Sequence, residues 1–218
     1  MSAVKLLKNA SGTGILSIAA PNTNTDRTLT LPDATTTLVG TDTTQTLTNK
    51  TLTSPTIGGT PTMNASVITS GTAQASTSGA YIDFTGIPSW VKRITVMFNG
   101  VSTNGTSDLL VQLGTSGGIT SSGYRSSASQ GTSSASSTAG FILTASLASA
   151  DTSDGIVTIS LLGSNAWSAS SALANGASNT VRIGAGGVTL GGTLTQLRIT
   201  TAGGVNTFDA GTINIQYE

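Results

Sequence analysis

The sequence predicts an all-β protein in which an extended, intertwined N-terminal stem leads into a C-terminal antiparallel β-sandwich with a jelly-roll-like arrangement. The 218 residues include 30 Ser, 40 Thr and 27 Gly, whereas charged residues make up only 8%. Thr, Val and Ile favour strands, and long runs of helix-forming Ala, Leu, Glu and Lys are few. Disorder is disfavoured because 37% of the residues are apolar and the formal net charge is zero.

The composition also excludes several function classes. The chain has no basic excess and no Lys/Arg stripe, so nucleic acid is not an expected partner. No run approaches the roughly 18 apolar residues of a membrane span, and residues 1–9 lack the apolar core of a signal peptide, so we expect synthesis in a cytoplasm without membrane insertion. Because cysteine is absent, stability outside a cell has to come from another source, such as oligomeric burial.

The aromatic residues divide the chain into two parts. All nine lie at or beyond Tyr81, and residues 1–80 contain none. Aromatic side chains supply the largest single burials, so we expect the first part to be thin and shared between chains. The predicted divisions are an attachment segment over 1–20, a stem over 21–75 and a β-sandwich over 76–218.

Short apolar alternations in the first part predict three strands, separated by turns at Pro, Asn and Gly. These strands cover residues 15–19, 28–31 and 36–39. A direct repeat follows, TLTNK at 46–50 and TLTSP at 51–55, which spaces Leu47, Leu52 and Ile57 five residues apart. Side chains of a flat strand alternate with period two, so this odd interval requires the chain to bend or wind. A ribbon wound with two other copies satisfies it, with these three residues in the shared core of a homotrimer.

Beyond residue 76, alternating apolar residues predict five strands, each with one buried face. The five sets are Ile94, Val96 and Phe98; Leu109, Val111 and Leu113; Val157, Ile159 and Leu161; Leu197 and Ile199; and Ile213, Ile215 and Tyr217.

Two segments rich in Ser, Thr and Gly, residues 114–140 and 163–179, are predicted to be loops. Tyr124, Arg125 and Trp167 within them are candidate surface contacts, and anchoring of the loops to the core explains them equally well. Trp90 is expected to be a core or interface anchor. The glycines at 184–187 and 191–192 are predicted to form turns, because no helical pattern follows them.

Little in the sequence supports catalysis. Histidine and cysteine are absent, which removes imidazole bases, thiol nucleophiles and the common zinc sites. Asp151 and Asp154 are the carboxylates closest in sequence, and a glycosidase needs two carboxyl groups on either side of the scissile bond. The sequence DTSDG around them is, however, more typical of a turn. It also lacks the oxygen spacing of a calcium loop. We therefore expect no enzyme, no metal and no cofactor.

Several strings resemble a known family. TLTNKTLTSPTI at 46–57, preceded by RTLTLPDATTTLVG at 27–40, resembles a linker element of tail-fibre and related virion proteins of tailed bacteriophages. YIDFTGIPSWVKRITVMFNGVS at 81–102 and FDAGTINIQYE at 208–218 are similar to a β-domain at the end of such proteins.

The resemblance implies a homotrimer on a phage virion, assembled in the host cytoplasm and attached to another virion protein. The attachment residues would be Val4, Lys5, Leu6, Leu7 and Lys8. It implies a short tail-associated fibre that contacts a host-surface glycan or protein, with three weak sites combining into avidity. A head fibre or capsid decoration protein is the alternative, and a polysaccharide-degrading tailspike is a third.

Overall fold

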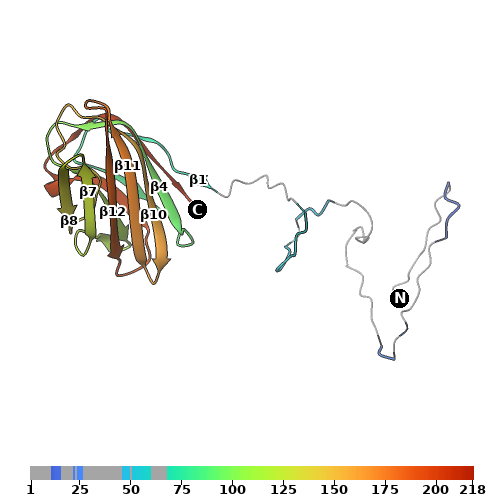
Figure 1. Ribbon diagram of the computed structural model, residues 1–218. Coiled ribbons are helices and arrows are strands. Elements are labelled where there is room, and N and C mark those ends of the chain that lie inside the picture. The colour runs from blue at the N-terminus through green and yellow to red at the C-terminus, as the bar shows by residue number, and fades with distance from the viewer. Residues whose placement is uncertain (1–10, 16–21, 23, 27–45, 50, 60–67) are drawn as a thin grey trace. The chain divides into compact units, whose positions relative to one another are not determined.

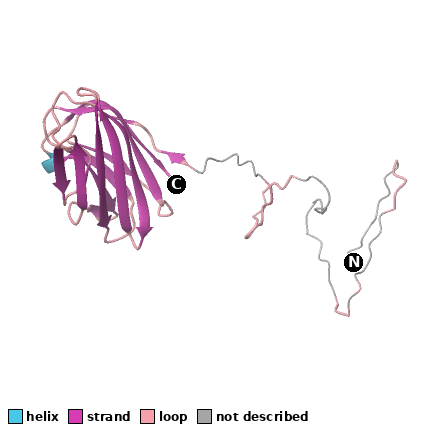
Figure 2. Ribbon diagram, viewed as in Figure 1, coloured by secondary structure: helices cyan, strands magenta, loops and turns pink. Residues whose placement is uncertain are grey.

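The computed structural model describes residues 11–15, 22, 24–26, 46–49, 51–59 and 68–218 (Figure 1). The chain divides into two units, residues 1–59 and 60–218, which are described separately. Within residues 68–218, the regular structure consists of strands joined by loops, apart from one short 3-10 turn at Ala202–Gly204 (Figure 2). The predicted strands at 15–19, 28–31 and 36–39 lie almost wholly outside the described residues.

The strands of the second unit have the following bounds: β1 Thr69–Ser70, β2 Gln74–Ala75, β3 Tyr81–Thr85, β4 Arg93–Thr103, β5 Leu109–Thr115, β6 Gly118–Ile119, β7 Arg125–Gln130, β8 Ser133–Ser137, β9 Phe141–Ile142, β10 Ser153–Gly163, β11 Ala166–Asn175, β12 Thr180–Thr189, β13 Gln196–Thr201 and β14 Phe208–Tyr217.

These strands form two antiparallel sheets, as the sequence predicts. The first sheet has the order β1-β14-β4-β10-β11-β12-β7-β8, with β2 also paired to β14, and the second has the order β3-β13-β5-β6, with β9 also paired to β5. Eight strands, namely β2, β3, β4, β5, β9, β10, β13 and β14, have the pairing of a jelly roll. The first, eighth, third and sixth of them lie in one sheet, and the second, seventh, fourth and fifth lie in the other.

The remaining long strands widen only the first sheet. The hairpin β7–β8 is inserted between β5 and β9, and the hairpin β11–β12 is inserted between β10 and β13. Both hairpins join the first sheet beyond β10, so that β4, β10, β11, β12, β7 and β8 lie side by side (Figure 1). The first sheet is therefore much wider than the second.

The core lies between the two sheets, and the five predicted alternating sets face it. Ile94, Val96, Val157 and Ile159 are completely buried, whereas Leu161 and Tyr217 pack against the core while partly exposed. Burial of one such aliphatic side chain stabilises the fold by about 1.5–3 kcal/mol. The prediction of one buried face is confirmed for four of these strands and wrong for β5, where Leu110 and Gln112 on the opposite face are buried as well.

The loop predictions for 114–140 and 163–179 are wrong. The first range contains β6, β7 and β8, and the second contains β11. Ser and Ala alternate there between an inner and an outer face: Ser126 and Ala128 are buried, whereas Ser127 is exposed. Ser, Ala and Gly have a low intrinsic preference for strands. They form regular strands here because their backbone groups hydrogen-bond to neighbouring strands.

The glycines at 184–187 are not a turn either, since they lie inside β12. A Cβ on Gly184 would lie 2.7 Å from the Ser171 hydroxyl oxygen and 2.9 Å from the Ile142 carbonyl oxygen. Glycine is therefore required for the close approach of β9 to the inner face of β12.

The β-domain begins ahead of the expected boundary at residue 76. Thr69 pairs with Tyr217, and Gln74 pairs with Ile213, so β1 and β2 are strands of the first sheet.

A buried cation fixes the inserted hairpins to the jelly roll. Arg182, on the inner face of β12, is fully buried. Its guanidinium donates to Gln130 Oε1 on β7 over 2.6 Å and to the Ser153 hydroxyl on β10 over 3.4 Å, and it forms an ion pair with Asp151. A buried charge is stable only when it is paired in this way, so the three strands have to hold a common register.

Arg182→Met is expected to lower the free energy of unfolding by about 3 kcal/mol, because it leaves the Asp151 carboxylate buried without its partner. Urea unfolding followed by circular dichroism measures this loss. Arg125→Met, an exposed position on β7 of the same sheet, is the matched control and should change stability by less than about 0.5 kcal/mol. Equal effects of the two substitutions would contradict the role of the buried pair.

Candidate functional site

The predicted stem residues are exposed in a single chain. Leu47, Leu52 and Ile57 have exposed fractions of 45%, 58% and 63%. Every described residue of 46–49 and 51–59 is exposed, and none of them belongs to a strand. This segment therefore presents its apolar side chains to solvent rather than to its own chain.

The backbone of this segment repeats with the same interval as its apolar residues. Asn49, Ser54 and Gly59 all have positive φ, at 55°, 49° and 80°. The left-handed region is uncommon for residues other than glycine, so its occurrence at every fifth residue marks a conformational repeat. The expected bend is confirmed: each unit carries one left-handed residue and, two positions before it, one apolar side chain. We call Leu47, Leu52 and Ile57 the apolar row.

The candidate attachment residues Val4, Lys5, Leu6, Leu7 and Lys8 lie outside the described residues.

Tyr124 is not a surface contact, because only 1% of it is exposed. Its ring packs edge-on against Phe141 with centroids 5.0 Å apart, and its hydroxyl oxygen accepts a 2.7 Å hydrogen bond from the Leu113 backbone N–H. Burial raises the pKa of Tyr124 to about 12, although the bond from Leu113 acts in the opposite direction. The tyrosine anchors the segment before β7 to β5.

The two tryptophans differ in burial. Trp167, a candidate contact, is buried on the inner face of β11, and its indole N–H has no hydrogen-bond partner among the described residues. Trp90 is 51% exposed and lies against Tyr217, with ring centroids 5.8 Å apart. The prediction that Trp90 anchors the core is therefore wrong, whereas its role at an interface stays a prediction.

Arg125 is the one candidate contact of the β-domain that is exposed. It lies at the start of β7 and lines a shallow depression together with Ser127, Ser136 and Thr138. Hydroxyls and a single guanidinium can hydrogen-bond a polar ligand, but the depression is open. The buried Ser126 hydroxyl in its lining already donates to the Ala185 carbonyl oxygen and accepts from the Ile142 backbone N–H.

The two aspartates of DTSDG serve the fold. Asp154 accepts a 2.6 Å hydrogen bond from the Gly100 backbone N–H. Burial alone would raise the pKa of Asp151, but the Ala148 N–H, the Asn175 side chain and Arg182 together lower it below its usual value. The ionised Asp151 carboxylate therefore stabilises the fold above about pH 4, and this stabilisation is lost as the pH falls through the lowered pKa.

No group of three or more His, Cys, Asp or Glu residues that could hold a metal occurs within the described ranges. The described residues likewise contain no helix of the length and apolarity needed to span a membrane.

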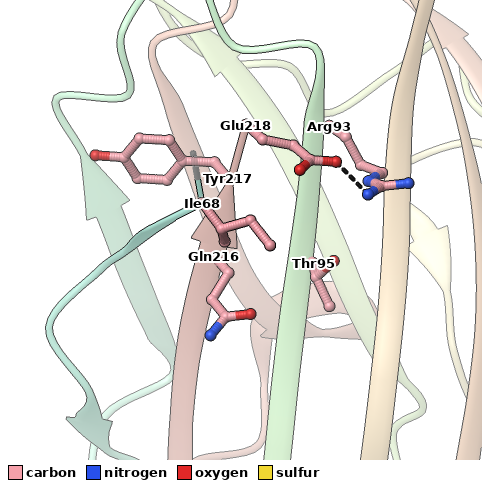
Figure 3. A pocket seen from close by; sticks show the side chains of 6 residues that line it. All are labelled: Ile68, Arg93, Thr95, Gln216, Tyr217 and Glu218. Carbon is pink, nitrogen blue, oxygen red and sulfur yellow. Dashed lines mark ion pairs between the residues drawn. The ribbon is translucent and has the colours of Figure 1, made fainter. Parts of the chain in front are cut away.

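A small recess lies where β1 joins β14 and β4 (Figure 3). Arg93 and Glu218 form an ion pair at its rim, and Ile68, Thr95, Gln216 and Tyr217 complete its lining. The Arg93 side chain is 53% exposed and the Glu218 side chain 33% exposed, and a pair in contact with solvent contributes only about 0–1 kcal/mol. The Arg93–Glu218 ion pair therefore joins the last residue to β4, and the recess offers little enclosed space for a ligand.

Comparison with known proteins gives no match: no family model, no curated protein and no solved structure is similar to this chain.

Sequence reasoning missed the outer face of the first sheet, where Ile156, Val181 and Ile183 are each about half exposed. The alternation Val181, Arg182, Ile183 was a usable signal, because a buried arginine between two exposed aliphatic residues inverts the usual pattern of a surface strand.

Tyr124 is expected to ionise above the ordinary pKa of a tyrosine, because burial disfavours its charged form. The raised pKa means that the folded state keeps the proton, so stability is retained below about pH 10 and lost as the pH rises toward 12. Absorbance titration at 295 nm should show a late step that Tyr124→Phe removes. Loss of an early step instead would contradict the burial of this hydroxyl.

Proposed function

We propose that this chain is a structural protein of a bacteriophage virion, a short homotrimeric tail-associated fibre that attaches to the host surface without catalysis. The conformational repeat of residues 46–59, with its exposed apolar row, carries the proposal. The resemblance of TLTNKTLTSPTI to phage fibre linkers adds the virion setting.

The repeat supports self-association because one chain leaves the apolar row in water. Three copies wound about one axis would bring nine such side chains together. Burial contributes about 1.5–3 kcal/mol for each large aliphatic side chain, so the row can hold three chains even though each contact is small. The left-handed residues at every fifth position turn each apolar side chain toward the axis.

The β-domain would then act as the distal, host-facing part. Its core is formed by buried aliphatic and aromatic side chains, and the chain has no cysteine that could form a disulfide. Arg125 and the hydroxyls around it are the proposed contact for a host-surface glycan or protein. Three such weak sites on one rigid body gain affinity through multivalency rather than through one strong contact.

A non-catalytic role is supported by the engagement of the carboxylates. A glycosidase requires two carboxyl groups on either side of a bound sugar, whereas Asp151 is paired with the buried Arg182 and Asp154 is bonded to the Gly100 backbone.

Light scattering of the full chain is expected to give the mass of three copies. Leu52→Asp places three carboxylates at the axis, so the concentration at which trimers dissociate should rise at least about tenfold, which corresponds to about 1.4 kcal/mol. Thr53→Asp adds the same charge one residue away from the apolar row and should change little. A monomeric wild type, or equal weakening by both variants, would overturn the trimeric stem.

The place on the virion is tested by immunogold electron microscopy of the particles that carry the chain, with antibodies raised against the β-domain. Label at the tail is expected. Label over the capsid would replace the tail-fibre proposal with a head fibre or decoration protein, and release of reducing sugar from host polysaccharide would overturn the non-catalytic role.

A further inference from the structure

The outer face of the first sheet carries apolar side chains in register across four neighbouring strands. Met97 on β4 pairs with Ile156 on β10, Ile156 pairs with Ala172 on β11, and Ala172 pairs with Ile183 on β12. Ile156 and Ile183 are 48% and 57% exposed. Val181 extends the apolar surface along β12 beside Ala174.

Small uncharged residues surround this row and keep the face flat. The next paired row consists of Thr95, Thr158, Ser170, Ala185 and Ser127, from β4 to β7. Charged residues lie only toward the ends of the strands, with Arg93 and Arg125 at one end and Asp154 at the other. A face without central charge can approach neighbouring copies around a threefold axis without like-charge repulsion.

The face is large enough for a stable contact. Six strands about 4.8 Å apart and about eight residues long give roughly 600 Å² for each copy. A standard interface buries about 800 Å² on each partner. Only part of this area is apolar, namely Met97, Ile156, Ala172 and Ile183 with Val181, and contiguous exposed apolar side chains of this kind are typical of an interaction surface.

We propose that this face contacts neighbouring copies of the same chain, so that the β-domains as well as the stems associate in the trimer. The inference rests on the proposed homotrimer. A second copy is the favoured occupant because β1, through which the chain enters the domain, belongs to this same sheet. Copies joined through residues 46–59 therefore all enter their β-domains at the first sheet.

The absence of cysteine allows a direct test on the full chain. Ala172→Cys places a thiol at the centre of the face, and Val205→Cys places one at an exposed position beyond the 3-10 turn, where the native valine is 72% exposed. In the trimer, a maleimide carrying a large polyethylene glycol should modify Cys at 172 at least tenfold more slowly than Cys at 205. In denaturant the two rates should be equal. Ser170→Cys, a nearly isosteric change on the same face, guards against misfolding of the first variant.

Slow modification at 172 could arise from contact with another copy or from shielding within the same chain. Adding Leu52→Asp to the Ala172→Cys chain distinguishes these two causes. At concentrations where the double variant is monomeric, rapid modification at 172 is expected. Slow modification there would show that the chain itself shields the site, and equal rates at 172 and 205 in a chain of trimeric mass would show that the face is free. Either result overturns this inference and leaves the trimeric stem standing, whereas a monomeric wild type overturns both.

Discussion

The proposed assembly of this protein depends on apolar side chains that a single copy leaves exposed to water. They occur in two places, the apolar row of residues 46–59 and the outer face of the first sheet. Neither place has a covering element within its own described unit. Because hydrophobic burial is the main favourable term in association as well as in folding, we propose that further copies of the chain cover both surfaces.

The wide first sheet connects the local sequence to this surface. A jelly roll alone would end this sheet at β10, and the hairpins β11–β12 and β7–β8 add four strands beyond it. Their alternating Ser, Ala and Gly residues allow close packing of β9 on one side and leave a flat surface on the other. Arg182, bonded to residues of β7 and β10 and paired with Asp151, holds the added strands in register from within.

The alternating apolar strands could be predicted from sequence because period two is a local signal and large aliphatic residues carried it. The hairpins could not, since Ser and Gly in residues 114–140 and 184–187 resemble loop residues until neighbouring strands supply their hydrogen bonds. Tyr124 and Trp167 were predicted as equally suited to contact or to anchoring, and only the packing around them shows that both are buried. The five-residue interval predicted bending but did not place it at Asn49 and Ser54. Asn adopts the left-handed region more readily than most residues and was a usable signal, whereas Ser54 had none of its own.

The most direct test of the central claim is a cryo-electron microscopy map of the purified full chain. We expect a threefold particle in which residues 46–59 of three copies surround one axis, Leu52 points inward, and the first sheets of the three β-domains contact one another. A map of separate single β-domains, with residues 46–59 of each copy away from those of the others, would contradict this expectation.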